Sequence, residues 1–343
     1  KKGKVKVILY GIGVMGSKAA KLLLKKEGVE IVGAIDIAKE KVGKDLGEVI
    51  NIKRKLGITI SNDPDVVFSK FKADIVVHAT SSFMKTVYPQ ITKAIDYNLN
   101  VVSSCEEMVY PYVAEPELAG KIDELAKQSQ VTVLGTGINP GFLMDTLPIT
   151  LTGACQKVET IKVTRVMNAA TRRIPFQKKI GAGLSVEGFK EKIQKKEITG
   201  HVGLSESISM IAGALGWELD RLKVDKVEPV VAKEDTASDA IKVPAGRVAG
   251  LRQCARGIIK EKEVIILDFN AFIGAKEEFD SITIKGVPNF TQKIVPCVHG
   301  DLGTIAVIVN SIPKVINAVP GLVTMKDLPV PSAAITDITR YLK

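Results

Sequence analysis

Two adjacent glutamates, Glu106 and Glu107, follow the short apolar run Val101–Ser104. Such a run predicts a buried strand, which would deliver Cys105 and both carboxylates to one edge of a parallel sheet, where ligands bind in α/β proteins. A carboxylate that is partly removed from water has a raised pKa and can pass protons to and from an amine, a carbinolamine or water. Paired glutamates are more often solvated loop acids. The position at a strand end favours the chemical role, so Glu106 and Glu107 are the candidate catalytic residues.

A second motif has the spacing GxGxxG, between a predicted strand at Val5–Tyr10 and a predicted helix at Ser17–Lys26. Its residues are Gly11, Ile12, Gly13, Val14, Met15 and Gly16. In this context the glycines allow a tight turn, close approach of a pyrophosphate and close helix–strand packing, and the helix N-terminus stabilises the phosphate charge. A plain strand–helix connection is the alternative, but the complete βαβ pattern, closed by a strand at Val29–Ile35, disfavours it. The motif predicts a bound dinucleotide.

Asp36 ends the second strand, where a carboxylate accepts hydrogen bonds from the adenosine ribose hydroxyls. This placement favours NAD, whereas Lys39 and Lys41, which could neutralise a 2′-phosphate, leave NADP open. Further candidate cofactor contacts are Cys105 and three residues just after the strand at Asp74–His78, which are Thr80, Ser81 and Ser82. We expect His78 itself to be a hydrogen-bonded core histidine.

Candidate substrate contacts come from three further segments. A loop rich in glycine and proline follows the strand predicted at Val131–Leu134, and its candidates are Asn139, Pro140, Gly141 and Phe142; the alternative is a plain interdomain hinge. Arg172 and Arg173 carry guanidinium groups able to hold a substrate carboxylate in a bidentate manner, although surface arginines are the commoner case. His299 could contact the substrate or pair with Asp301.

Strands alternate with helices up to residue 145, which predicts a Rossmann-type doubly wound parallel sheet. Beyond it, β-rich segments at Val158–Val166, Glu263–Ile273 and Asp280–Ile284 predict a second α+β domain with a mostly antiparallel sheet. We therefore expect a dinucleotide-binding domain over residues 1–145, a substrate and oligomerisation domain over 146–299, and a C-terminal helix over 300–343 that returns to the first domain before a proline-rich tail. A second domain of this kind often forms a dimer interface, so a homodimer is expected.

Composition narrows the class of protein. The 343 residues are 45% hydrophobic and 25% charged, as in ordinary globular proteins, and no apolar run approaches the roughly 20 residues that span a bilayer. The short apolar run after the basic N-terminus leads into the glycine loop, so we expect no signal peptide. Four cysteines without a CxxC pair argue against a metal site and favour the cytoplasm. The net charge of +10 comes from dispersed lysines with only 5% aromatic residues, so we expect no nucleic-acid partner.

Several segments together resemble 2,4-diaminopentanoate dehydrogenase and the native amine dehydrogenases, within the wider superfamily of 4-hydroxy-tetrahydrodipicolinate reductase. They span nearly the whole chain: LYGIGVMG at 9–16, Val42–Glu48, VVSSCEEMVY at 101–110, INPGF at 138–142, TRRIPFQKKIGAGL at 171–184 and VHGD at 298–301. The reductase has a tandem histidine near a lysine, whereas this chain has 3 histidines and none is adjacent to another. That difference counts against a reductase.

The resemblance implies NAD(P)-dependent oxidative deamination of 2,4-diaminopentanoate at C4 to 2-amino-4-oxopentanoate and ammonia, a step of ornithine catabolism, or in reverse the reductive amination of ketones. In the family a glutamate at the strand end handles the ammonia, which places that role at Glu106 or Glu107, with Glu106 the first choice. The alternatives are another amino-acid or diamino-acid dehydrogenase of the same fold, a reductase-like enzyme, or a non-catalytic protein that senses NAD or binds nucleic acid.

Overall fold

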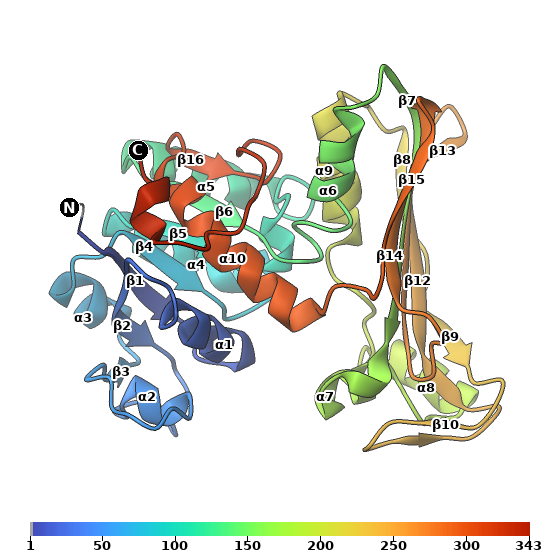
Figure 1. Ribbon diagram of the computed structural model, residues 1–343, viewed down its shortest axis with the longest axis horizontal. Coiled ribbons are helices and arrows are strands. Elements are labelled where there is room, and N and C mark those ends of the chain that lie inside the picture. Colours follow the sequence, from blue (N-terminus) through green and yellow to red (C-terminus); the bar gives the residue numbers. More distant parts are fainter. Residues whose placement is uncertain (1–2) are drawn as a thin grey trace. The chain divides into compact units, whose positions relative to one another are not determined.

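The computed structural model describes residues 3–343 and divides the chain into two compact units. Unit 1 comprises the residues up to Phe142 together with Gly300–Lys343, and unit 2 comprises Leu143–His299 (Figure 1). The second unit thus begins at Leu143 rather than at residue 146, and the chain from Gly300 onward packs as part of unit 1.

Unit 1 is built on a seven-stranded parallel sheet in the order β16-β6-β5-β4-β1-β2-β3. The strands are β1 (Val5–Tyr10), β2 (Val29–Ile35), β3 (Ile60–Ser61), β4 (Ile75–His78), β5 (Asn100–Ser103), β6 (Thr132–Gly135) and β16 (Gly321–Val323). The helices are α1 (Val14–Leu23), α2 (Leu46–Val49), α3 (Pro64–Lys70), α4 (Met84–Asp96), α5 (Pro116–Gln128) and α10 (Gly300–Ile316), with 3-10 turns η1 (Glu106–Met108) and η3 (Ile338–Tyr341). This architecture confirms the predicted doubly wound class.

Helices flank the sheet, with α1 packed beside α10 and α4 beside α5. Because helices cover the sheet, β4 and β6 are buried at every position, which explains why their sequences are apolar without alternation. The register aligns the carboxyl ends of four strands: Tyr10 pairs with His78, His78 with Ser103, and Ser103 with Gly135. The segments that follow these strands therefore emerge at one edge of the sheet.

Unit 2 is built on a mixed seven-stranded sheet along the path β15-β14-β7-β13-β12-β8, with β9 also paired to β12. The strands are β7 (Lys157–Asn168), β8 (Arg221–Val224), β9 (Glu228–Val231), β12 (Val248–Ile259), β13 (Lys262–Phe272), β14 (Phe279–Val287) and β15 (Phe290–Ile294), and β10 (Thr236–Ala237) pairs separately with β11 (Lys242–Val243). Its helices are α6 (Thr146–Thr152), α7 (Ile174–Lys179), α8 (Val186–Gln194) and α9 (Leu204–Leu215), with a 3-10 turn η2 (Ala169–Thr171). Only β7 and β13 run parallel, which confirms the mostly antiparallel second sheet.

Several elements differ from the sequence-based expectation. Strand β12 was not predicted, because glycines and charged residues interrupt its apolar pattern. Helix α1 begins at Val14 rather than Ser17, since Gly13 is its N-cap. The tail after α10 is more than surface chain: β16 extends the parallel sheet beside β6, and Ile338 is fully buried. Among the helices of residues 3–343, none has the length and apolar character needed to cross a membrane.

Candidate active site

The glycine loop between β1 and α1 has the geometry that a dinucleotide needs. Gly11 has a φ of +94°, and a Cβ there would lie 2.4 Å from the Ala79 carbonyl oxygen. A Cβ on Gly16 would lie 1.8 Å from the Gly11 carbonyl oxygen, so both positions exclude any side chain. A Cβ on Gly13 would meet nothing within 4 Å. The open space over Gly13, at the N-terminus of a ten-residue helix, fits a pyrophosphate.

Asp36 is tied to this loop. Its Oδ2 accepts hydrogen bonds from the Ile12 amide at 2.7 Å and from Lys41 Nζ at 3.0 Å, and its Oδ1 accepts one from the Ala38 amide at 2.9 Å. Burial alone would raise the pKa of Asp36, but the two amides and the Lys41 ammonium outweigh it and hold the pKa below its usual value. The carboxylate is thus charged at neutral pH and fixed beside the loop.

The segment after β4 folds back onto α4. Thr80 Oγ1 donates to Gln90 Oε1 at 2.6 Å, and Ser81 Oγ accepts from the Phe83 amide at 3.3 Å. The Ser82 carbonyl accepts from the Glu107 amide at 3.2 Å. The structure therefore brings the predicted cofactor contacts at 80–82 together with the predicted catalytic turn.

The turn η1 is fixed from three sides. Ser103 Oγ accepts from the Cys105 amide at 3.1 Å, and Glu107 Oε2 accepts from the Met84 amide at 2.6 Å. A Cβ on Gly135 would lie 2.4 Å from the Met108 carbonyl carbon, so this glycine lets β6 approach the turn closely. These contacts give Glu106 a defined backbone position at the sheet edge.

The two glutamates are not equivalent. The Glu107 carboxylate is engaged at the first amide of α4, where an acid stabilises a helix N-terminus. Glu106 is partly exposed, and within residues 3–343 its carboxylate has no hydrogen-bond or ion-pair partner. Of these two carboxylates, only that of Glu106 is without such a partner in this part of the chain.

Cys105 differs from its neighbours, because its side chain points into the core. It is fully buried, and burial raises the pKa of its thiol to about 12. A contact between Cys105 and a cofactor would therefore use its backbone and not its sulfur.

The loop after β6 is tightly folded within unit 1. Gly141 has a φ of +122°, and a Cβ there would lie 2.3 Å from the Gly137 nitrogen. The Ile138 amide donates to Thr304 Oγ1 of α10 at 3.3 Å, which anchors the segment that carries Asn139, Pro140 and Phe142. The structure thus gives these predicted substrate contacts a defined backbone position beside α10.

In unit 2, Arg172 has few partners for a buried cation. Its side chain is 9% exposed, its Nη2 lies 3.7 Å from Glu278 Oε1 and 3.7 Å from Cys297 Sγ, and its buried Nε has no hydrogen-bond partner among the described residues. Neighbouring Arg173 is exposed and is the N-cap of α7. The two predicted arginines therefore have different environments, and Arg172 is the one with an unused buried donor.

Val298, the residue before His299, is hydrogen-bonded through its backbone to a buried ion pair that the sequence did not predict. Arg165 Nη1 lies 2.8 Å from Asp280 Oδ1, and both side chains are almost completely buried. Asp280 Oδ2 accepts from the Val298 amide at 2.9 Å, and Arg165 Nη2 donates to the Val298 carbonyl. The signal was present as opposite charges on neighbouring strands, but the sequence did not show that β7 and β14 pair.

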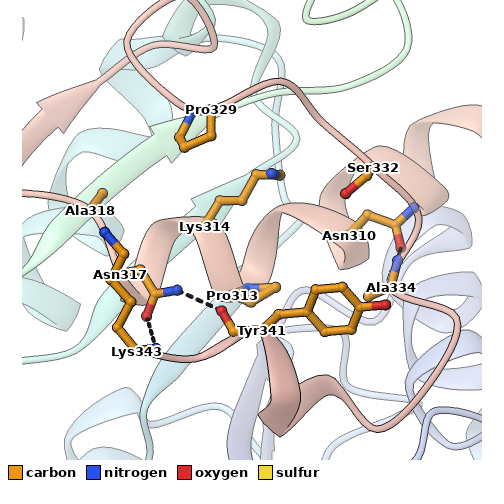
Figure 2. Close-up of a pocket in the computed structure, with 10 residues that line it drawn as sticks. All are labelled: Asn310, Pro313, Lys314, Asn317, Ala318, Pro329, Ser332, Ala334, Tyr341 and Lys343. Carbon is orange, nitrogen blue, oxygen red and sulfur yellow. Dashed lines mark hydrogen bonds between the residues drawn. The ribbon is translucent and has the colours of Figure 1, made fainter.

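One cavity of about 230 Å³ lies in unit 1 between α10 and the C-terminal tail (Figure 2). Its polar groups largely bind the tail itself: Asn317 Nδ2 donates to the Tyr341 carbonyl at 2.7 Å, and Lys314 Nζ donates to the Val330 carbonyl at 2.9 Å. No predicted site residue lines it. This cavity therefore reflects packing of the tail on α10, and we place the candidate site at the sheet edge instead.

Two family patterns and a curated relative match this chain. The pattern of the family described as 2,4-diaminopentanoate dehydrogenase C-terminal domain matches residues 142–343, and that of dihydrodipicolinate reductase, N-terminus, matches residues 5–105. The chain is 41% identical to 2,4-diaminopentanoate dehydrogenase of Acetoanaerobium sticklandii over 340 aligned residues. The alignment covers 97% of this chain and 96% of that protein.

Solved structures extend the comparison. An amine dehydrogenase from Mycobacterium smegmatis superposes with a TM-score of 0.82 at 28% identity, over 97% of this chain and 98% of that one. A dihydrodipicolinate reductase from Paenisporosarcina sp. TG-14, at 14% identity and a TM-score of 0.52 over 94% of this chain and 98% of that one, shares the fold. A dehydrogenase family together with this glycine loop supports a nicotinamide dinucleotide as cofactor. The chain belongs to the 2,4-diaminopentanoate dehydrogenase family of oxidoreductases.

Proposed function

We propose that the protein catalyses the NAD(P)-dependent oxidative deamination of 2,4-diaminopentanoate at C4, giving 2-amino-4-oxopentanoate, ammonia and reduced cofactor. The observation that carries the proposal is the 41% identity to a 2,4-diaminopentanoate dehydrogenase over 97% of the chain. The position of Glu106 supports it, since its carboxylate lies on the turn that follows β5 and has no partner among the residues from Gly3 onward.

A nicotinamide ring, when bound, accepts a hydride from the amine-bearing carbon of the substrate. Glu106 stabilises the positive charge of the resulting iminium, accepts a proton from the attacking water and returns it to the departing ammonia. Glu107 takes no part in proton transfer, because its carboxylate is occupied by the Met84 amide. Its role is to hold the turn η1 in place against α4.

For the cofactor we propose NAD as the preferred partner, with NADP accepted. The amides at the start of α1 and the space over Gly13 would hold the pyrophosphate, and Asp36 would accept from the adenosine ribose hydroxyls. Lys41, now 3.0 Å from Asp36, and exposed Lys39 are the cations available to a 2′-phosphate. The further cofactor contacts that we propose are Thr80, Ser81, Ser82 and the Cys105 backbone.

For the substrate, we propose that Arg172 holds the carboxylate through its guanidinium group, which has no close acceptor among the described residues. A buried guanidinium group is costly without a full set of acceptors, and a carboxylate supplies two oxygens in the matching geometry. His299, Arg173 and the loop Asn139–Phe142 are proposed as the remaining substrate contacts. Arg172→Met should raise the KM for 2,4-diaminopentanoate about tenfold or more with little change in the KM for NAD.

We also propose a homodimer formed through the unit 2 sheet. On the face opposite the buried residues of β7 and β13, the apolar side chains Val166, Ile266 and Phe272 are only partly buried. A second copy would cover them. Light scattering on the purified protein would give the mass of a dimer, and a monomer at micromolar concentration would contradict this part of the proposal.

A panel of matched substrates tests the reaction. With NAD or NADP, 2,4-diaminopentanoate and 4-aminopentanoate should each produce reduced nicotinamide, whereas 2-aminopentanoate, which lacks the C4 amine, should not. With ammonia and reduced cofactor, simple ketones should be consumed. Activity with 2-aminopentanoate alone would instead favour an amino-acid dehydrogenase acting at C2, and no absorbance change in either direction would refute the proposal.

A further inference from the structure

A chain of hydrogen bonds joins the ends of β4 and β5 beneath the catalytic turn. His78 Nδ1 lies 2.9 Å from Ser103 Oγ, and His78 Nε2 lies 2.7 Å from Gln90 Oε1 and 3.0 Å from Thr80 Oγ1. His78 and Ser103 are 1% and 0% exposed, which confirms His78 as a core histidine. The Tyr10 ring packs edge-on against the imidazole at 5.4 Å between ring centres and restricts its tilt.

The direction of each bond follows from the chemistry of its atoms. Gln90 Oε1 can only accept, so His78 Nε2 carries the proton. In the neutral ring Nδ1 is then an acceptor, and the Ser103 hydroxyl donates to it. The Ser103 oxygen keeps a lone pair free for the Cys105 amide, at 3.1 Å.

The opposite tautomer satisfies these groups less well. It would direct two N–H donors, from His78 Nδ1 and from Cys105, at the Ser103 oxygen, and it would leave the Ser103 proton without an acceptor within this chain of bonds. Buried donors are rarely left unpaired. Burial also lowers the pKa of His78 to about 4, so the ring stays neutral near pH 7.

We propose that His78 is a positioning residue for Glu106. As the Nε2–H tautomer it orients the Ser103 hydroxyl, Ser103 holds the Cys105 amide, and the Cys105 amide fixes the start of the turn that presents Glu106. This inference rests on the proposed role of Glu106 in proton transfer. It assigns to His78 an effect on kcat although the side chain is buried beneath the turn.

Two amide variants separate positioning from space filling. His78→Asn places an amide oxygen as many bonds from Cβ as Nδ1, so it can still accept from Ser103. His78→Gln places its amide as far along the side chain as Nε2, so it keeps the bond to Gln90 and loses the acceptor for Ser103. If His78 only filled space, the larger glutamine would be the better substitute; positioning predicts the reverse order.

With 2,4-diaminopentanoate and NAD, kcat should stay within about threefold for His78→Asn and should fall about tenfold or more for His78→Gln, because small displacements of a reacting group are costly. The kcat of Ser103→Ala, a variant that lacks only the hydroxyl oxygen, should fall as far as the kcat of His78→Gln. The double variant should be no worse than Ser103→Ala, since both act through one bond. Should His78→Gln fail to fold, the comparison of Ser103→Ala with His78→Asn still decides the matter.

Nitrogen NMR of the imidazole provides a readout independent of turnover. It should show a protonated Nε2 and an unprotonated Nδ1, and hydrogen exchange at the Cys105 amide should quicken in His78→Gln and Ser103→Ala but not in His78→Asn. A protonated Nδ1, or higher kcat for His78→Gln than for His78→Asn, would overturn the inference and leave the proposed reaction standing. Full turnover by Glu106→Gln would instead refute the proposed role of Glu106 without altering the tautomer.

Discussion

Glu107 Oε2 accepts a hydrogen bond of 2.6 Å from the Met84 amide at the first residue of α4. This bond separates the roles of two neighbouring carboxylates that the sequence could not distinguish. It engages Glu107 in holding the turn η1 against α4, and Glu106 is the carboxylate to which we assign proton transfer.

The first prediction concerns this bond. Glu107→Ala should lower the free energy of unfolding by about 1 kcal/mol, as the loss of a helix cap usually does. Glu107→Gln keeps an oxygen that can accept from the Met84 amide, so it should lose less stability and keep kcat within about threefold. Urea unfolding and steady-state kinetics measure the two effects. A large loss of kcat in a stably folded Glu107→Gln variant would show that the charge of Glu107 enters the chemistry.

The second prediction uses the unequal space around the loop glycines. Gly13→Ala meets no neighbour and has an ordinary φ of −73°, so the fold should be kept. Its methyl group would occupy the space proposed for the pyrophosphate, so the KM for NAD should rise about tenfold or more. Gly16→Ala would collide with the Gly11 carbonyl oxygen and should destabilise unit 1.

Gly120→Ala is the matched control for the second prediction. This glycine lies in α5, where a Cβ also meets nothing, and alanine there should stabilise the protein by up to about 1 kcal/mol with kinetics unchanged. An unaltered KM for NAD in Gly13→Ala would contradict the proposed place of the pyrophosphate.

The third prediction concerns cofactor choice. The wild-type protein should have a lower KM for NAD than for NADP, because Asp36 repels a 2′-phosphate. Lys41→Ala should raise the KM for NADP about tenfold, by the loss of one charge-assisted bond, with that for NAD nearly unchanged. Lys44→Ala, whose side chain is 50% exposed and lies 3.9 Å from Glu48, is the control and should change neither. Equal effects of Lys41→Ala on both cofactors would count against a 2′-phosphate contact.

The fourth prediction follows from two histidines, of which His78 is buried and His201 is partly exposed. Burial lowers the pKa of His201 to about 3 and that of His78 to about 4, against about 6.5 for an unfolded histidine. Below pH 6.5 the unfolded chain binds more protons than the folded one. The free energy of unfolding should therefore fall with falling pH, by up to about 1.4 kcal/mol per pH unit for each histidine, until the folded pKa is reached.

Trp217 is the single tryptophan of the chain and lies in unit 2 with His201, so its fluorescence during urea unfolding reports on that unit. His201→Phe removes the titration and can preserve the stack on Phe269, whose ring centre is 4.4 Å from that of His201. In this variant the free energy of unfolding should change less between pH 7 and pH 5 than it does in the wild type. A slope equal to that of the wild type would show that His201 is not the source.

Much of unit 1 could be predicted because its signals are local. The apolar runs of β1, β4 and β5, the GxGxxG spacing and Asp36 lie where the pattern puts them, and the order of a doubly wound sheet brings their ends to one edge. The network of His78, Gln90 and Ser103 could be expected only in part. Its members come from three elements, and their contacts depend on a register that the sequence does not show.

Unit 2 was harder to predict for the same reason. The pairing of Arg165 with Asp280 spans 115 residues along the chain and depends on the adjacency of β7 and β14. Arg172 could be named as a candidate substrate contact, but its burial and its unused Nε are tertiary features. Sequence reasoning found residue types suited to the chemistry and left their environments undetermined.

The central claim is that Glu106 moves the protons of an amine deamination, and its most direct test is kcat for 2,4-diaminopentanoate and NAD in Glu106→Gln. The account predicts a loss of about a hundredfold to ten-thousandfold. In the same Glu106→Gln variant, the KM for NAD and the free energy of unfolding should stay near the wild-type values, because the Glu106 carboxylate has no partner within residues 3–343. Full turnover by Glu106→Gln would contradict the account.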